Sequence, residues 1–305
     1  MVSKNLCLGV QREKRSSSLL YDCFILTKPT ITLLVVVTTL PSLLLASKQM
    51  PSLFMITMTL LGTALASGSA AVFNQLIESK IDCEMERTKK RSLPSGRLSN
   101  YQAAIFAVIM GLAAFLILYF LAKPLAAFIA FAGHVYYVFF YTMFLKKKTP
   151  QNIVIGGAAG AVGPLIGWAA VTGTLDWPAW ILFLMIVLWT PPHFWALALK
   201  YKEDYAKVGI PMYPVIYGDK KTHKQMFLYT LSLVPTIVVL YIGGVVGVSY
   251  LFCAGAFTIK FIWDAYKLLL TGDNKLAMPL FHYSCTYAFI LFLGLVFDKW
   301  LQNII

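Results

Sequence analysis

Residues 52–73 read SLFMITMTLLGTALASGSAAVF, and residues 74–97 continue NQLIESKIDCEMERTKKRSLPSGR. The first part is long and apolar enough to cross the hydrocarbon core of a bilayer as a helix. The second part gathers acids, an amide and many bases directly after it. The stretch therefore predicts a membrane helix that ends in a charged segment.

The whole chain has the composition of a membrane protein. Of its 305 residues, 59% are hydrophobic and only 13% are charged, which is too apolar for an ordinary soluble domain. We expect an all-α bundle of about nine transmembrane helices, forming one domain over residues 23–305 after a cytoplasmic tail of residues 1–22. The predicted spans are about 24–46, 51–76, 101–121, 124–145, 152–171, 178–199, 225–246, 248–270 and 280–301.

The basic residues predict how the chain is oriented. If the N-terminus is cytoplasmic, only Lys48, Lys123 and Lys299 of the 26 bases lie in outer segments, and Lys260 lies within a span. This is the positive-inside pattern. We expect a multi-pass protein of the cell membrane, with its C-terminus outside and its active site near the cytoplasmic face. The same pattern accounts for the net charge of +13, so no nucleic-acid partner is expected.

Three oxygen-bearing side chains follow the second predicted span at helical spacing. If the helix continues past Phe73, then Asn74, Glu78 and Asp82 lie within about 80° of one another on one face. Such groups at a bilayer edge indicate a functional site, and they suit Mg²⁺, which takes one or two carboxylates and completes its shell with phosphate oxygens. The alternative is that the acids only pair with neighbouring bases in a solvated loop.

The bases that follow match an anionic ligand. Arginine and lysine donors of this kind bind diphosphate or carboxylate groups, although the positive-inside pattern alone would also place bases here. The candidates in this segment are Arg87, Lys90, Arg91 and Arg97.

This segment resembles a known family. The pattern N-x-x-x-E-x-x-x-D, followed by M-E-R-T-K-x-R-x-L-P-S-G-R, is similar to the first acidic motif of the UbiA-type intramembrane prenyltransferases, whose usual form is N-x-x-x-D-x-x-x-D with R-T-x-x-R-P-L after it. Glu78 stands where Asp is usual, and Ser92 stands where Pro is usual. The resemblance implies the UbiA-type fold and a Mg²⁺ site that holds an isoprenoid diphosphate.

Other stretches narrow the resemblance. LTKP near the first span, YTMFLKKKTPQNIVIGGAAGAVGPLIGW, PPHFWALALKYKEDY and GIPMYPV are similar to the protohaem IX farnesyltransferases, the haem O synthases of this superfamily, over about residues 22–298. That family transfers the farnesyl group of farnesyl diphosphate to a vinyl group of haem b, with addition of water. The implied partners are therefore farnesyl diphosphate, haem b and the lipid bilayer, with a haem A synthase or a terminal oxidase downstream.

The resemblance also implies roles in a second polar loop. Asp204 would be a further metal carboxylate, with Tyr205 and Lys200 beside it, and Lys200 stands where relatives that act on quinone precursors carry an acid. Lys146 and Lys148 would reach the diphosphate, unless they only mark the end of a span.

His193 follows two prolines within the sixth predicted span, where proline frees backbone carbonyls. It would bind haem iron, act as a base on the incoming water, or only bond a freed carbonyl. His134 is expected to be structural, and His282 stays open. Close helix packing is the simpler account of Gly156, Gly157, Gly160 and Gly163, although a flat porphyrin could use the same groove.

Three other functions stay open from the residues. A related prenyltransferase would act on an aromatic quinone precursor and would favour a second cluster of aspartates. A secondary transporter would show two symmetric halves with polar sites at the midplane, and a haem-binding assembly factor would leave the acidic stripe without a purpose.

Overall fold

A computed structural model describes residues 18–302, and over this range the chain is helical without strands. The first half contains α1 (Leu19–Leu26), α2 (Pro29–Ala46), α3 (Leu53–Glu84), α4 (Asn100–Leu121), α5 (Pro124–Val135), the π-helix η1 (Tyr136–Leu145), α6 (Lys146–Lys148), α7 (Asn152–Gly160) and α8 (Val162–Thr172). The second half contains α9 (Trp177–Lys200), α10 (Lys202–Lys207), α11 (Tyr213–Leu231), α12 (Leu233–Ile242), α13 (Val248–Thr271), the 3₁₀ turn η2 (Asn274–Leu276) and α14 (Ala277–Gln302).

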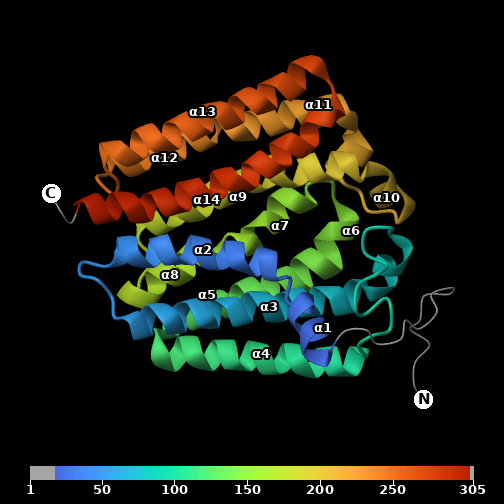
Figure 1. Cartoon of the computed structure of the whole chain (residues 1–305), viewed down its shortest axis with the longest axis horizontal. Coiled ribbons are helices and arrows are strands. Elements are labelled where there is room, and N and C mark those ends of the chain that lie inside the picture. Colours follow the sequence, from blue (N-terminus) through green and yellow to red (C-terminus); the bar gives the residue numbers. More distant parts are fainter. Residues whose placement is uncertain (1–17, 303–305) are drawn as a thin grey trace.

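The long helices lie roughly side by side, as a bundle that crosses a membrane requires (Figure 1). Within residues 18–302, nine segments are long and apolar enough to span a bilayer, which confirms the predicted number. They are 29–46, 53–84, 100–121, 124–148, 152–172, 177–200, 213–242, 248–271 and 274–302. Most of the expected tail, residues 1–22, lies outside the described residues, and the part that is described begins α1.

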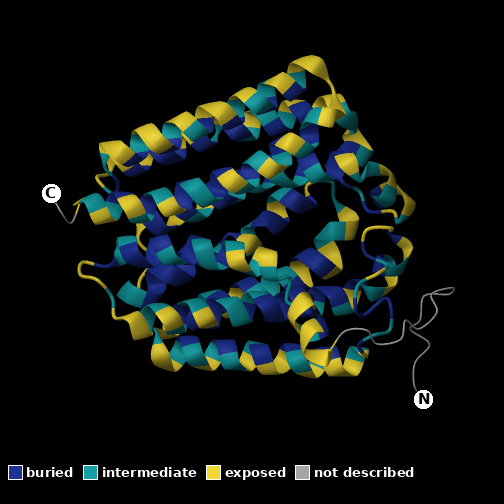
Figure 2. Cartoon of the chain, in the orientation of Figure 1, coloured by how far each residue is buried: buried dark blue, intermediate teal, exposed yellow. Residues whose placement is uncertain are grey.

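Burial separates the central helices from the peripheral ones. The α7–α8 segment has 61% of its most apolar window buried, whereas α4 has 22%, so α7–α8 runs through the middle of the bundle and α4 lies at its edge (Figure 2). Large apolar side chains such as Phe120 and Phe252 are more than 70% exposed. Their exposure fits a lipid surrounding, where apolar side chains can face outward.

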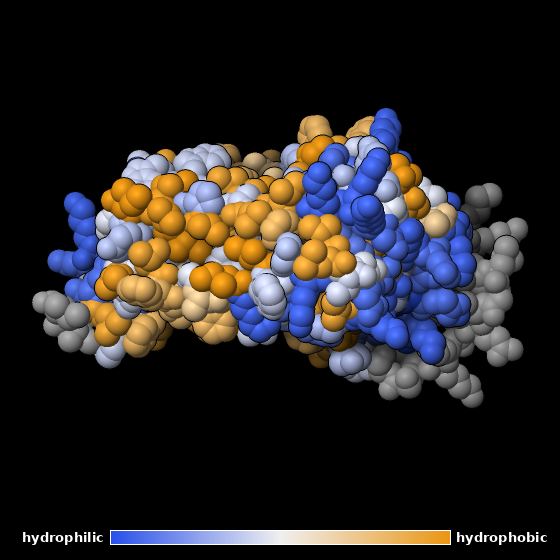
Figure 3. All heavy atoms as spheres, turned by 90° about the horizontal axis from the view of Figure 1, so that it is seen from above, coloured by the Kyte–Doolittle hydropathy of each residue, from blue (hydrophilic) through white to orange (hydrophobic). Residues whose placement is uncertain are grey.

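Polar side chains gather at one end of the bundle. That end carries α10 and the connection from α3 to α4, and Figure 3 shows hydrophilic residues covering it while apolar residues cover the middle. The α14 helix ends at the opposite side (Figure 1). The helices that meet at the polar end therefore bring residues 22–28, 74–98 and 146–148 to one region.

Candidate active site

The predicted polar stripe is present on α3. The helix continues to Glu84, as expected, and Asn74, Glu78 and Asp82 are 2%, 5% and 3% exposed. They face the interior of the bundle and not solvent, so the reading as a solvated surface loop is wrong for these side chains. Burying charged groups is costly unless they are paired, so their partners decide what the stripe can do.

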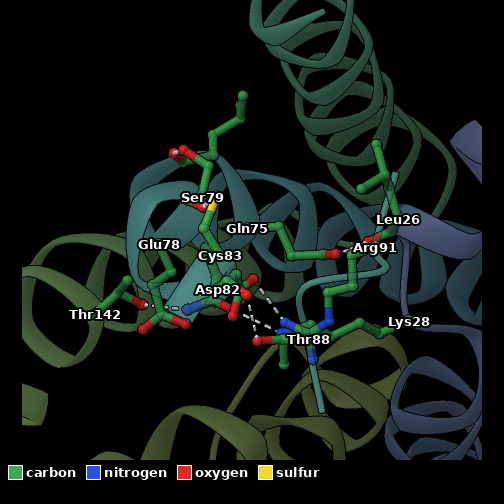
Figure 4. Close-up of polar contacts among 12 residues, drawn as sticks. Leu26, Lys28, Gln75, Glu78, Ser79, Asp82, Cys83, Thr88, Arg91 and Thr142 are labelled. Carbon is green, nitrogen blue, oxygen red and sulfur yellow. Dashed lines mark hydrogen bonds and ion pairs between the residues drawn. The ribbon is translucent and has the colours of Figure 1, made fainter. Parts of the chain in front are cut away.

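Each member of the stripe has its own basic partner from a different element. Lys28 Nζ donates to Asn74 Oδ1 at 2.6 Å, Lys146 Nζ to Glu78 Oε1 at 2.5 Å, and Arg91 Nη1 to Asp82 Oδ2 at 2.8 Å. Figure 4 shows the Arg91 guanidinium directed at the Asp82 carboxylate. Three buried oxygen-bearing side chains and three partly buried bases therefore form one cluster, which we call the oxygen–base cluster.

Lys28 is a member that the sequence interpretation missed. It precedes Pro29 at the start of α2 and has φ +50°, the one positive φ of a non-glycine residue within residues 18–302. Such left-handed residues cost free energy and concentrate at functional sites. Gln75 Nε2 donates to the Leu26 carbonyl at 2.7 Å, which ties this turn to α3. Burial, with Arg91 nearby, lowers the pKa of Lys28 to about 7.

The connection between α3 and α4 is a packed turn that presents Arg91. The Thr88 hydroxyl donates to the Asp82 carbonyl at 3.0 Å and so continues the end of α3. Ser92 Oγ donates to Asp22 Oδ1 at 2.8 Å, and Arg97 Nε reaches the same oxygen at 3.2 Å. Ser92, which stands where the family motif usually has proline, thus anchors the turn to α1. Arg97, predicted to bind substrate, pairs here with Asp22.

The π-helix η1 forms another wall of the cluster. Asn74 Nδ2 donates to Thr142 Oγ1 at 3.2 Å, and that hydroxyl donates to the Tyr137 carbonyl at 2.8 Å. π-helical segments are rare and frequent at functional sites. The segment ends at Lys146, which pairs with Glu78. The predicted contact of Lys146 with the diphosphate stays a prediction.

A chamber extends from the oxygen–base cluster into the bundle. The space measures about 600 Å³, including the part that is open to the outside, and Lys28 and Tyr137 line its polar end. On α3 its lining residues are small, and they precede Asn74 in the sequence and extend away from the cluster toward the other membrane face: Thr63, Ala66, Ser67, Ala70 and Ala71. Apart from Lys28, none of the described residues that line it is charged. The chamber can therefore hold an apolar chain whose charged head lies at the cluster.

The remaining predicted residues lie around the polar end. Arg87 and Lys200 are exposed, and each lies 5.7 Å from the centre of the Tyr201 ring. Lys90 and Lys148 are also exposed, Asp204 is half-buried on α10, and Tyr205 on the same helix is 2% exposed. No hydrogen bond or ion pair among the described residues joins Asp204 to the stripe on α3. Its role as a metal ligand stays a prediction.

His193 lies in a separate aromatic environment on α9. Its ring is stacked between Trp189 and Phe281, with centroid separations of 4.3 and 4.6 Å. Ser284 Oγ donates its one hydrogen to the Phe281 carbonyl at 2.6 Å, so it accepts from His193 Nδ1 at 2.7 Å. The proton then lies on Nδ1, and Nε2 keeps its lone pair. His193 therefore bonds a hydroxyl and not a carbonyl freed by proline.

The glycines of α7 and α8 have two different roles. An added Cβ would meet Tyr141 at 2.1 Å from Gly156, Thr190 at 3.0 Å from Gly157 and Thr38 at 2.6 Å from Gly163. These contacts confirm close helix packing for three of the four. Gly160 differs, because nothing lies within 4 Å of its added Cβ. It lines both the chamber and a second pocket that includes Trp189.

The donor set of the cluster fits a magnesium ion. Among the described residues no group of three His, Cys, Asp or Glu side chains gathers to hold a metal. Two carboxylates and an amide are the oxygen ligands that suit Mg²⁺ when phosphate oxygens complete its shell. The three bases would pair with that phosphate. Asn74, Glu78 and Asp82 would hold the ion, which would stabilise negative charge on a departing diphosphate.

A membrane bundle with such a cluster at the mouth of an apolar chamber defines an intramembrane enzyme for substrates with a charged head and an apolar chain. The chain belongs to the UbiA prenyltransferase family, whose model matches residues 35–293.

Two curated relatives are similar over nearly their whole lengths. A protein of Gloeobacter violaceus named protoheme IX farnesyltransferase is 48% identical over 93% of this chain and 94% of its own. A protein of the same name from Alcanivorax borkumensis is 43% identical over 92% of this chain and 93% of its own.

Solved structures share the fold at lower identity. A structure described for digeranylgeranylglyceryl phosphate synthase matches with a TM-score of 0.76 and 20% identity, over 92% of this chain and 98% of the other. A UbiA homologue of Archaeoglobus fulgidus bound to DMAPP and Mg²⁺ matches with a TM-score of 0.65 and 13% identity, over 90% of this chain and 99% of the other. These likenesses confirm the predicted UbiA-type fold.

Proposed function

We propose that the protein is a haem O synthase. It transfers the farnesyl group of farnesyl diphosphate to a vinyl group of haem b, with addition of water, and releases diphosphate. The observation that carries this proposal is the oxygen–base cluster at the mouth of an uncharged chamber. The names of relatives that match over nine-tenths of both chains support the choice of substrates.

The cluster binds the diphosphate and stabilises it as it leaves. Lys28, Arg91 and Lys146 come from three elements and converge on the stripe of α3, so a diphosphate at the stripe meets positive charge from several sides. Charge-assisted hydrogen bonds from these groups are stronger than neutral ones. Preorganised positive groups of this kind lower the barrier to parting diphosphate from an allylic carbon.

The chamber protects the carbon that the diphosphate leaves. As the bond from C1 of the farnesyl group to the diphosphate oxygen breaks, C1 becomes electron-poor and water would destroy it. The α3 residues that line the chamber, which precede Asn74 in the sequence, are small and mostly apolar. Among the described lining residues, Lys28 is the one lysine, arginine, aspartate or glutamate. A vinyl carbon of haem b then forms the new bond to C1, and water adds to the neighbouring vinyl carbon with loss of a proton.

His193 is the proposed contact of the acceptor. With its proton on Nδ1, its Nε2 atom can bind the haem iron or accept the proton of the incoming water. Trp189 stacks on His193 and lines the pocket that Gly160 shares with the chamber. Haem beside His193 would therefore lie next to the isoprenoid.

The site is proposed to face the cytoplasm. The polar end carries the cluster and the basic connections, as the positive-inside pattern expects. Asp204 is assigned to the metal as a further ligand. The residues assigned to binding of the diphosphate or haem propionates at this face are Tyr205, Lys200, Arg87, Lys90, Arg97 and Lys148. A haem A synthase or a terminal oxidase is the proposed recipient of the product.

The deciding experiment incubates the purified protein, in lipid nanodiscs with Mg²⁺, with farnesyl diphosphate and either haem b or 4-hydroxybenzoate. We expect farnesylated, hydrated haem by mass spectrometry and no product from 4-hydroxybenzoate. Product from 4-hydroxybenzoate alone would overturn the proposal in favour of a quinone-precursor prenyltransferase. A Ser284→Ala variant, which removes the acceptor for His193 Nδ1, should also change the absorption spectrum of bound haem.

A further inference from the structure

A second apolar cavity opens toward the lipid beside the chamber. It lies between α3, α4 and α5, has an empty volume of about 940 Å³, and its larger lining residues include Phe73, Val108, Leu112, Phe115, Phe128 and Phe131. Four of these are about half exposed or more, at 47%, 60%, 54% and 56% for Val108, Leu112, Phe128 and Phe131. We call this cavity the lateral groove. None of the described residues that line it is an aspartate, glutamate, lysine or arginine, and its polar members are Ser69 and His134.

The lateral groove and the chamber share a thin wall. Ala66 on α3, together with Ala130 and His134 on α5, lines both. An alanine has no rotatable side chain that could open or close a passage. Of the three shared residues, His134 is therefore the one whose side chain can join or separate the two spaces.

His134 contacts two residues of α3 in the wall. Its ring meets Phe73 edge-on with the centroids 5.6 Å apart, and its imidazole lies close to the backbone of Ala66. A polar side chain at this depth of a membrane helix is costly and usually has a purpose. The proposed reaction does not use this imidazole, so its position between two apolar spaces needs a separate account.

The wall lies at the depth reached by the far end of an isoprenoid. Ala66 is eight residues from Asn74 along α3, which corresponds to about 12 Å of helix. A farnesyl chain that starts at the oxygen–base cluster and follows the small side chains of α3 passes this depth with its last isoprene unit. A chain longer by one isoprene unit would need further space there.

We propose that the lateral groove is a binding site for the end of an isoprenoid chain, and that His134 separates it from the chamber and so sets the chain length that the enzyme accepts. This inference rests on the proposed function, because it assumes that an isoprenoid diphosphate binds at the oxygen–base cluster. The imidazole makes His134 a specificity-determining residue that does not touch the reacting atoms.

The first test removes the wall. In His134→Ala, and in His134→Ser as a second variant in case the first folds poorly, the ratio of kcat/KM for geranylgeranyl diphosphate to that for farnesyl diphosphate should rise at least about tenfold, since discrimination by apolar contacts is of this order. An unchanged ratio in a well-folded variant would overturn the inference.

The second test asks where the added isoprene unit goes. Val108→Trp, placed in the His134→Ala background, should fill the lateral groove and return the ratio toward that of the unmodified protein. Ile109→Trp is the matched control, because Ile109 is the neighbouring α4 residue, is 60% exposed and does not line the groove. Equal effects of the two tryptophans would contradict the inference.

A binding readout separates this inference from the proposed function. A geranylgeranyl diphosphate analogue with a photoreactive group at its far end should label residues 107–115 of α4 in His134→Ala, without any haem present. Labelling confined to α2 and α8 would overturn the inference. If the unmodified protein converts farnesyl diphosphate and haem while these tests fail, the proposed function stands and only the role of the lateral groove falls.

Discussion

At the scale of single residues, the cluster depends on which base meets which oxygen. The spacing of Asn74, Glu78 and Asp82 was predictable, because helical periodicity alone brings them to one face. The contact of Lys28 with Asn74 was not predictable, because in the sequence a lysine before a proline at the end of a span cannot be distinguished from any other base that follows the positive-inside pattern. Its left-handed backbone is visible only in the folded chain.

Removing the charge of Lys28 tests its assignment to the site. We expect Lys28→Met to raise KM for farnesyl diphosphate about 10- to 100-fold, because a hydrogen bond to a charged group contributes about 1.5–3 kcal/mol. Lys28→Arg should recover part of the loss. The control is Lys48→Met, an exposed lysine between α2 and α3 at the other end of α2. Equal KM values for Lys28→Met and the unmodified protein would exclude Lys28 from substrate binding.

At the scale of elements, the α7–α8 span is interrupted after Gly160 and lines the chamber. Its glycines indicated close packing, and the contacts of Gly156 with Tyr141 and of Gly163 with Thr38 agree. The sequence could not distinguish Gly160 from these packing glycines. The open space beside Gly160 depends on how α2, α5 and α9 surround the end of α7. The π-helical form of η1 was equally hidden, since its residues are ordinary apolar and aromatic ones.

Two substitutions on α7 should separate packing from cavity formation. Gly156→Ala forces Tyr141 to move and should destabilise the fold by about 1–3 kcal/mol, as overpacking usually does. Gly160→Ala meets nothing within 4 Å and should leave the melting temperature unchanged. Thermal unfolding in detergent compares the pair. Equal melting temperatures would contradict the packing role of Gly156, because they would mean that Tyr141 can move aside without a loss of stability.

At the scale of the whole molecule, composition and hydropathy were sufficient to predict the number of spans. Within residues 18–302, the nine segments long enough to span a bilayer match the nine predicted spans closely, except that the second extends to Glu84 and the seventh begins at Tyr213. Both extensions lie in charged segments, where hydropathy no longer reports on helix formation. The chamber and the lateral groove were beyond prediction, because they arise from packing between distant helices.

Orientation is also a property of the whole chain. An alkaline phosphatase fused after Gln302 should be active, because this enzyme folds outside the cytoplasm and α14 ends opposite the polar end. A fusion after Lys148, at the polar end, should be inactive. The reverse pattern would place the oxygen–base cluster at the outer face and contradict the proposed topology.

The most direct measurement of the central claim is magnesium-dependent binding of farnesyl diphosphate to the purified protein in nanodiscs. We predict tight binding with Mg²⁺ in the unmodified protein, loss of binding on chelation with EDTA, and weaker binding in Asp82→Asn. The turnover of Asp82→Asn should fall about 100-fold or more, since removing one preorganised group from such a site lowers kcat by about that much. Glu86→Gln is the matched control, because Glu86 is an exposed acid of the same segment that pairs with Lys89. Undiminished binding and turnover of Asp82→Asn in excess EDTA would contradict the account.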